Sequence, residues 1–411
     1  MAMEHSMQHD NDNDNNDNAN DDDGNNTTVS MTDPSKFREL PPGFQCGEEL
    51  EDGGIGSIGR CGVSFYCVLP PASNRDDTGG VNGEPEKNQT QRSTTSNSQH
   101  QHQHQHQEQQ QQQRRKLTFR CRDRSVGVLE SKESAITKAE YDATDTAEAM
   151  DPFFFDAGYT LAGRTGFQVW SGTRLMIESL LFHLTDDSDR LVAIQKEINS
   201  TDGKDILELG AGVGVVGTTL AAATACRVLL TDLPTLVENS LLPNLKQNQD
   251  ESRADDKQSV SEPAWLRKAS ANMEFEEEED DEDVVFPLGD RGGWGSIANI
   301  DWTERLNEEV SSVSSLDWII ASDCVWLISM LDSLLNTVDS LFRLNPKARL
   351  ILSFQRRDAG DTTRFSTVEG IVDNVRNRGW SIDCLAWRYV RQEGSTEPKE
   401  VFVFEIIPGS K

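Results

Sequence analysis

Histidine is scarce in the part of this 411-residue sequence that has a globular pattern, and its scarcity excludes several classes of enzyme. Six of the seven histidines lie in low-complexity tracts, at positions 5, 9, 100, 102, 104 and 106. We interpret His183, on the packing face of an expected helix, as a core residue. A Ser-His-Asp hydrolase or a histidine-based metal site therefore has no evident histidine, and we predict no bound metal.

Cysteines and long apolar runs are also few. The seven cysteines are odd in number and scattered, without a CxxC pair, and no apolar signal region opens the sequence. We therefore expect a reduced compartment, the cytoplasm, with the nucleus as a second location. The most apolar stretch, residues 213–230, contains three threonines and Arg227, so a helix followed by a strand explains it better than a membrane span. We expect no membrane partner.

Basic residues are outnumbered, because 39 Lys and Arg stand against 70 Asp and Glu, a formal net charge of −31. Residues 1–35 and 274–283 contain nine acids each, so these two segments supply 18 of the 31 surplus charges. Such a balance excludes simple binding to phosphate backbones, and we expect no nucleic-acid partner. The remainder of the chain is only mildly acidic.

Composition divides the chain into biased tracts and one domain of ordinary size. Residues 1–35 are rich in Asn and Asp, and we expect them to be disordered. Residues 36–70 and 116–150 have strand-like segments, which predicts a small N-terminal β extension interrupted by a His/Gln-rich insert at 71–115. Residues 151–411 form the main domain, with a disordered acidic insertion at about 250–290.

Strands alternate with helical patterns from Gly158 onward, which predicts an α/β fold with a mostly parallel sheet. We expect helices at 171–184, 213–224, 235–247, 328–343 and 364–378. We expect seven strands, at 205–209, 226–231, 297–301, 316–322, 349–354, 381–387 and 400–407. The last two are too close in sequence for a helical crossover, so one strand near the C-terminal edge should be reversed.

The segment Ile206–Gly217 is the strongest chemical signal, since a strand leads through a glycine turn into an Ala-rich helix. Backbone can approach a ligand closely at such a turn, while helix N–H groups face it. Gly212, Gly214 and Gly217 also satisfy the dinucleotide fingerprint, which is weak alone. Glu208 places a carboxylate near the strand end, where it suits a ligand amine better than a pyrophosphate.

Further polar and aromatic residues follow the ends of other expected strands. Asp232 ends the second strand, where an acid accepts hydrogen bonds from ribose hydroxyls. Trp302 follows the third strand, and Ser322 and Asp323 close the fourth. Because ligands of open α/β sheets bind at the carboxyl ends of strands, we expect these side chains to share one crevice, with Trp170 beside it.

These segments together resemble the signature motifs of the family-16 lysine methyltransferases, a group of seven-strand S-adenosylmethionine enzymes. The resemblance covers roughly residues 160–410 and implies a Rossmann-like class I methyltransferase fold. Its motifs are, in order, Val169-Trp170, Leu207–Gly214, Thr231–Pro234, Asn244 within Leu242–Leu245, Asp301-Trp302 and Asp317–Asp323.

The resemblance also implies a cofactor site and an acceptor site. The cofactor S-adenosylmethionine would be lined by Trp170, Gly210, Ala211, Gly212, Asp232, Trp302 and Ser322, with Glu208 holding the methionine amine through water. The family has an acid, two variable residues and a tyrosine after the fourth strand, whereas this sequence has Asp323-Cys324-Val325-Trp326. Ser322 also stands where the family usually has alanine.

Methyl transfer from a sulfonium mainly requires alignment, desolvation and a neutral acceptor. We predict that Asp323 orients the amine of a substrate lysine and that Trp326 walls its channel. The expected activity is lysine methylation of a protein substrate by a monomer. Two alternatives stay open: another acceptor, such as protein histidine or a small amine, and a cofactor-binding interaction module without catalysis.

Overall fold

The computed structural model describes residues 45–50, 63–69, 115–121, 166–182, 188–254, 262–271, 284–313, 315–357, 365–390 and 399–409. The tracts 1–35 and 71–114, residues 122–150 of the expected β extension, His183 and the acidic run 274–283 lie outside the described residues. No helix in the described ranges combines the length and the apolar character that a bilayer crossing requires.

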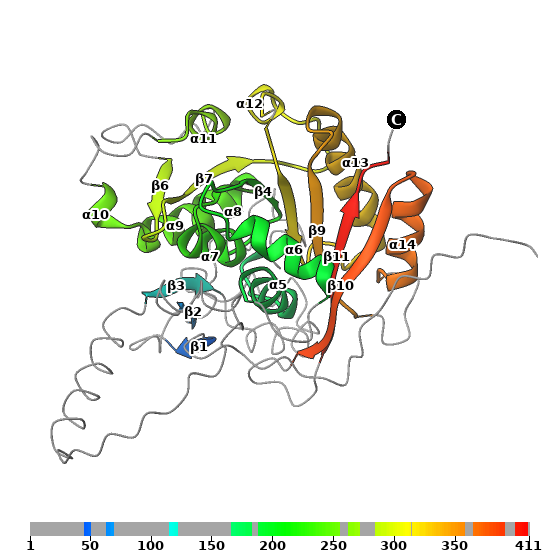
Figure 1. Ribbon diagram of the computed structural model, residues 1–411, viewed down its shortest axis with the longest axis horizontal. Helices are drawn as coiled ribbons and strands as arrows, with labels where there is room; N and C mark the ends of the chain where they lie inside the picture. Colours follow the sequence, from blue (N-terminus) through cyan, green and yellow to red (C-terminus); the bar gives the residue numbers. More distant parts are fainter. Residues whose placement is uncertain are drawn as a thin grey trace, which may run out of the picture.

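Eight strands form the main sheet, in the spatial order β10-β11-β9-β8-β4-β5-β7-β6 (Figure 1). Their bounds are β4 (Asp205–Leu209), β5 (Arg227–Asp232), β6 (Val285–Leu288), β7 (Gly293–Asn299), β8 (Trp318–Ser322), β9 (Arg349–Gln355), β10 (Ser381–Val390) and β11 (Lys399–Ile407). The five strands from β7 to β9 are parallel, whereas β11 runs antiparallel to both β9 and β10. The predicted mostly parallel sheet with one reversed strand near its C-terminal edge is confirmed.

The prediction of seven strands is one strand short. The structure adds β6, which pairs antiparallel with β7 at the edge of the sheet. Its sequence, Val285–Leu288, contains Pro287, and the sequence reasoning placed this segment in the acidic insertion. Proline has no N–H to donate, so an edge strand with one neighbour is the position in a sheet that accepts it.

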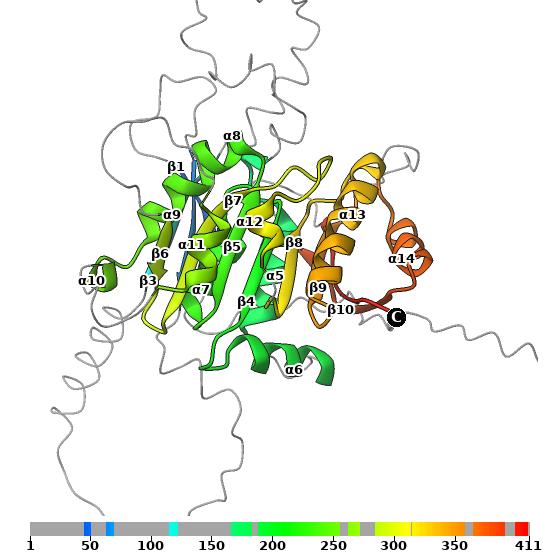
Figure 2. The ribbon, with the colours of Figure 1, turned by 90° about the horizontal axis from the view of Figure 1, so that it is seen from above.

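Helices cover both faces of the main sheet, as the view from above shows (Figure 2). One face packs against α5 (Ser171–Leu181), α7 (Val215–Ala223) and the segment formed by α8 (Pro234–Leu236), the π-helical turn η4 (Val237–Leu241) and α9 (Leu242–Asn248). The other face carries α11 (Ala264–Ala269), α12 (Glu308–Ser311), α13 (Ile328–Leu344) and α14 (Val368–Asn377). Strand β4 shows why: Ile206 joins one apolar core and Leu207 the other, so neither face can be solvated.

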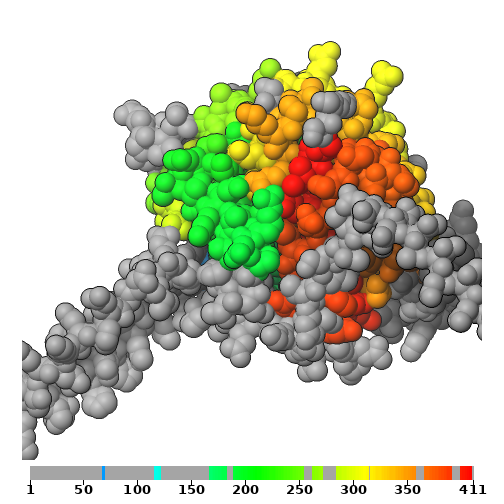
Figure 3. Space-filling view, turned by 45° about the vertical axis from the view of Figure 1, so that its right-hand side comes forward, coloured from blue at the N-terminus to red at the C-terminus, as the bar shows by residue number. Residues whose placement is uncertain are grey.

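Helix α6 (Asp189–Ile198) was not predicted, although its signals are present. The Ser188 hydroxyl accepts a hydrogen bond from the Leu191 amide, and Leu191, Ile194 and Ile198 are buried at helical spacing. Arg190 of α6 forms a bidentate ion pair with Glu405 of β11, 215 residues away in sequence. Figure 3 shows the green atoms of the early helices beside the red and orange atoms of the C-terminal strands.

A second, small antiparallel sheet contains β1 (Gln45–Leu50), β2 (Val63–Leu69) and β3 (Arg115–Cys121). Side-chain amides of α9 complete the edge of β3. Asn244 accepts from the Arg120 amide at 2.8 Å and donates to the Arg120 carbonyl at 3.2 Å, and Asn248 makes the same pair of bonds with Thr118. Four residues of helix rise about 6 Å and two residues of strand about 6.7 Å, so the two spacings match.

Replacement of Asn244 by alanine is expected to lower the free energy of unfolding by about 2–3 kcal/mol. Besides its two bonds to Arg120, the Asn244 side chain donates to the Val213 carbonyl beside the glycine turn. Alanine would leave these buried partners unpaired. Urea denaturation measures this change. Asn239→Ala is the matched control, since its exposed amide bonds only Thr235 of its own helical turn. Equal losses in both variants would contradict the anchoring role of Asn244.

Candidate active site

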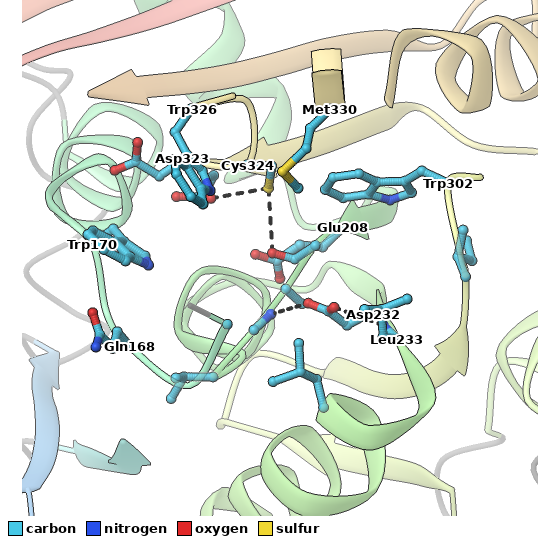
Figure 4. A pocket seen from close by; sticks show the side chains of 18 of the residues that line it. Gln168, Trp170, Glu208, Asp232, Leu233, Trp302, Asp323, Cys324, Trp326 and Met330 are labelled. Atoms are coloured by element: carbon cyan, nitrogen blue, oxygen red, sulfur yellow. Dashed lines mark hydrogen bonds between the residues drawn. The ribbon is translucent and has the colours of Figure 1, made fainter. Parts of the chain in front are cut away.

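A cavity of about 460 Å³ lies at the carboxyl ends of the central parallel strands (Figure 4). Trp170, Asp323 and Trp326 lie on one side of it, Trp302 on the other, and Glu208 and Asp232 between them. The ten residues predicted from the sequence all line this one cavity: Trp170, Glu208, Gly210, Ala211, Gly212, Asp232, Trp302, Ser322, Asp323 and Trp326. The fold therefore brings together segments that are 156 residues apart at the extremes, between positions 170 and 326.

The glycine turn after β4 is shaped by residues that must be glycine. Gly210 and Gly212 both have positive φ, +64° and +55°. A Cβ at Gly210 would lie 2.8 Å from the Trp302 ring, and one at Gly212 would lie 2.6 Å from the Gly166 carbonyl oxygen. Any side chain would therefore fill the turn against Trp302 or the segment before α5, so the backbone alone forms this wall of the cavity.

Two buried carboxylates hold this turn in place. Asp232 accepts from the Gly212 amide at 2.7 Å and from the Leu233 amide at 2.8 Å. Glu208 points toward α7, where it accepts from the Gly217 amide at 2.9 Å in the first turn of the helix. Burial raises the pKa of Glu208 to about 8 and that of Asp232 to about 6. In the ligand-free protein near neutral pH, Glu208 is therefore mostly protonated.

Asp323 is held by contacts on both carboxylate oxygens. Its backbone has φ +58°, in the left-handed region that non-glycine residues rarely adopt. Oδ2 accepts from the Gly172 amide at 3.0 Å and Oδ1 from the Gln355 amide at 2.9 Å, while Arg357 Nη2 lies 3.3 Å from Oδ1. This buried carboxylate thus joins the ends of β8 and β9 to the start of α5.

Beside it, three hydroxyl groups form a chain that leads from the cavity wall into the protein interior. Ser322 Oγ lies 3.3 Å from Thr173 Oγ1 and 3.1 Å from Ser353 Oγ. A Cβ at Gly172 would lie 2.7 Å from that same Ser353 oxygen. Alanine at position 322 would remove the middle member of this chain, so the serine has a structural partner here.

With this geometry established, comparison with known proteins becomes informative. A family model described as "Lysine methyltransferase" matches residues 159–280 and 296–371, which include the glycine turn and both acidic strand ends. The chain is similar to this methyltransferase family over just under half of its length. No curated protein matches the sequence at a significant level.

Several solved structures of methyltransferases match this chain at low sequence identity. A SAM-dependent methyltransferase from Methanosarcina mazei is 14% identical, with a TM-score of 0.31, and the match covers 52% of this chain and 97% of that one. The glycopeptide N-methyltransferase MtfA, solved with sinefungin, is 14% identical, with a TM-score of 0.30, and the match covers 55% of this chain and 88% of that one. Pyrococcus horikoshii TYW2, in complex with MeSAdo, is 9% identical, with a TM-score of 0.29. The match covers 55% of this chain and 64% of that one, so this chain spans less than two thirds of that protein. The similarity to the lysine methyltransferase family therefore rests on the family model alone.

Several residues in or beside the cavity were not among the predicted site residues. Met330 and Ser333 line it from the first turns of α13, and Cys324 lines it because it directly follows Asp323. Arg357, two residues past the end of β9, contacts Asp323 and lies over the Trp170 ring. The strand-end rule that located Asp323 would also have located Arg357, had it been applied to the strand predicted at 349–354.

Glu208→Gln is expected to flatten the pH dependence of stability. Because the folded protein holds a proton on Glu208 that the unfolded chain releases, the free energy of unfolding falls as pH rises from about 4.5 to about 8. Glutamine has no proton to release and removes this part of the slope. Urea denaturation from pH 5 to pH 8 measures it, and parallel curves for the variant and the native protein would contradict the buried, protonated state.

Proposed function

We propose that this protein is an S-adenosylmethionine-dependent N-methyltransferase that acts on a lysine side chain of a protein substrate. The observation that carries the proposal is the cavity itself, which joins a bare-backbone glycine turn with two acids to a wall of Asp323, Trp170 and Trp326. The glycine turn with its two acids suits an adenosyl amino acid, and the wall of Asp323, Trp170 and Trp326 suits a cationic side chain. The match to the lysine methyltransferase family model supports the same acceptor.

The residues present fit this cofactor. The turn at Gly210 and Gly212 leaves room for close approach of a ligand, which a Cβ at either position would occupy. Asp232, at the end of β5, is placed for ribose hydroxyls. Glu208 is a buried acid without a basic partner in the described part of the chain, so a ligand ammonium beside it would favour its ionised form and pair with it.

When bound, the sulfonium of this cofactor supplies an activated methyl group, so the protein needs no acid or base as strong as hydrolysis requires. The acceptor lysine must release a proton to solvent before its amine attacks the methyl group, and desolvation lowers its pKa from the ordinary value of about 10.4. Trp170 and Trp326 exclude water from the acceptor side, and Asp323, fixed by two backbone amides, offers an oxygen to the remaining amine hydrogens.

A labelled-methyl experiment tests the proposal. The full chain is incubated with cell lysate and S-adenosylmethionine labelled on its methyl group, and mass spectrometry then identifies the modified residues. Gly212→Ala serves as the inactive control. Isothermal calorimetry with S-adenosylhomocysteine tests cofactor binding independently.

Each outcome bears on a different part of the proposal. Label on protein lysine supports it in full. Label on histidine or on a small amine would overturn the lysine acceptor and leave the methyltransferase. Absence of S-adenosylhomocysteine binding would overturn the whole proposal.

A further inference from the structure

Three residues that line the acceptor side of the cavity, Trp170, Trp326 and Asp323, already contact a cation of the chain itself, Arg357. The guanidinium carbon of Arg357 lies 4.5 Å from the centre of the Trp170 ring and 5.7 Å from that of Trp326. Its Nη2 is 3.3 Å from Asp323 Oδ1, and its side chain is only 14% exposed. Two aromatic faces and one carboxylate around a positive group are the arrangement that binds ammonium ligands.

Arg357 satisfies the carboxylate but is itself poorly satisfied. Its Nη1 and Nη2 atoms are buried, and neither forms a hydrogen bond within the described part of the chain. Nη2 is close to Asp323 Oδ1, but the contact is an ion pair without hydrogen-bond geometry. Buried donors without acceptors cost free energy, because they have lost water and gained no replacement. The guanidinium thus supplies the positive charge that buried Asp323 requires, while its extra N–H groups make it an imperfect occupant of the site.

We infer that Trp170, Trp326 and Asp323 form a binding site for the cationic side chain of the acceptor, and that Arg357 fills this site until the acceptor displaces it. This inference rests on the proposed function and adds to it the way in which the site selects its substrate. The exchange conserves charge, since one cation leaves Asp323 as another arrives. A lysine or methylated lysine has fewer N–H groups than a guanidinium, so fewer donors are left unpaired.

The exchange also determines which acceptors are excluded. A side chain that arrives neutral or acidic cannot replace Arg357 without leaving Asp323 buried and unpaired, so the acceptor lysine enters as an ammonium and loses its proton in the site. Arg357 also competes with the methylated product, because both are cations that can pair with Asp323. The structure thus assigns to Arg357 the discrimination between cationic and other acceptors.

Arg357→Met tests this inference, because methionine keeps an apolar stem and removes the cation. The probe is tetramethylammonium chloride, whose methyl signal reports binding by ligand-observed NMR. We expect its Kd to fall at least tenfold in the variant relative to the native chain. Arg356→Met is the matched control, since Arg356 ion-pairs with Glu400 and lies over Phe402, and it should leave the Kd unchanged.

A second measurement needs no variant. Phenylglyoxal modifies exposed arginines, and peptide mapping reports the rate at each site. Saturating tetramethylammonium should raise the modification rate of Arg357 at least threefold and leave that of Arg356 unchanged.

An unchanged rate at Arg357, or equal Kd values for the native chain and Arg357→Met, would overturn the inference. The S-adenosylhomocysteine titration separates the two levels. Failure of that titration counts against the proposed function, whereas normal cofactor binding without cation exchange counts against the role of Arg357 alone.

Discussion

Gly212→Ala is expected to weaken S-adenosylhomocysteine binding at least about 100-fold, which corresponds to about 2.7 kcal/mol. The added Cβ would lie 2.6 Å from the Gly166 carbonyl oxygen, and neither backbone can yield as a flexible side chain would. The residue also has φ +55°, which an alanine adopts only with strain. The turn must therefore move, which breaks the 2.7 Å bond from its amide to Asp232 and deforms the cofactor wall.

Gly292→Ala is the matched control for this prediction. Gly292 also has positive φ, +90°, but no atom lies within 4 Å of the position its Cβ would take. It lies in the turn between β6 and β7, and it does not line the cavity. The Gly292→Ala variant should have the same backbone strain, and its Kd for S-adenosylhomocysteine should stay within about twofold of the native value. Calorimetry measures both variants, and equal losses would mean that backbone strain, not the close approach at Gly212, governs the effect.

Asp323→Asn is expected to lower kcat/KM at least about 100-fold while S-adenosylhomocysteine binding changes by less than about threefold. Asparagine has one acceptor oxygen, so it can keep only one of the bonds from the Gly172 and Gln355 amides. It also removes the charge that pairs with Arg357 and, in our proposal, with the acceptor. Loss of a group that aligns the reacting amine costs rate more than cofactor affinity. Kinetics on the acceptor identified by labelling measure the change.

Asp317→Asn provides the comparison for Asp323. Asp317 precedes the same strand, β8, at its opposite end, where it accepts from the Asp205 amide at 3.0 Å and lies 3.6 Å from Lys204 Nζ. It likewise combines an amide bond with an ion pair, and it does not line the cavity. We expect its substitution to affect stability and to leave kcat/KM within about threefold. A similar loss of rate in both variants would assign Asp323 a purely structural role.

Local patterns predicted most of the cofactor side of the site. The run from Ile206 to Gly217 predicts a strand, a turn and a helix in turn, because apolar residues come first, closely spaced glycines follow, and the start of an Ala-rich apolar segment comes last. Asp232 and Asp323 were found because parallel strands must end at one edge of the sheet. The reversed strand followed from the short connection before β11, which a parallel crossover could not span.

Tertiary contacts decided the features that the patterns do not contain. The pairing of Asn244 and Asn248 with β3 joins residues more than 120 positions apart, and neither segment signals the other. The eighth strand depends on β7, because Val285–Leu288 has an edge to pair with only once the parallel sheet exists.

The cation in the acceptor cage is the clearest example. The sequence by itself predicted that Asp323, Trp326 and Trp170 would lie at one crevice beyond the end of the fourth strand. It did not determine that Arg357, two residues past the end of β9, would lie among them. Charge pairs and ring contacts act over a few ångströms in space, whereas sequence patterns report only neighbours along the chain, so this cage exists only in the folded protein.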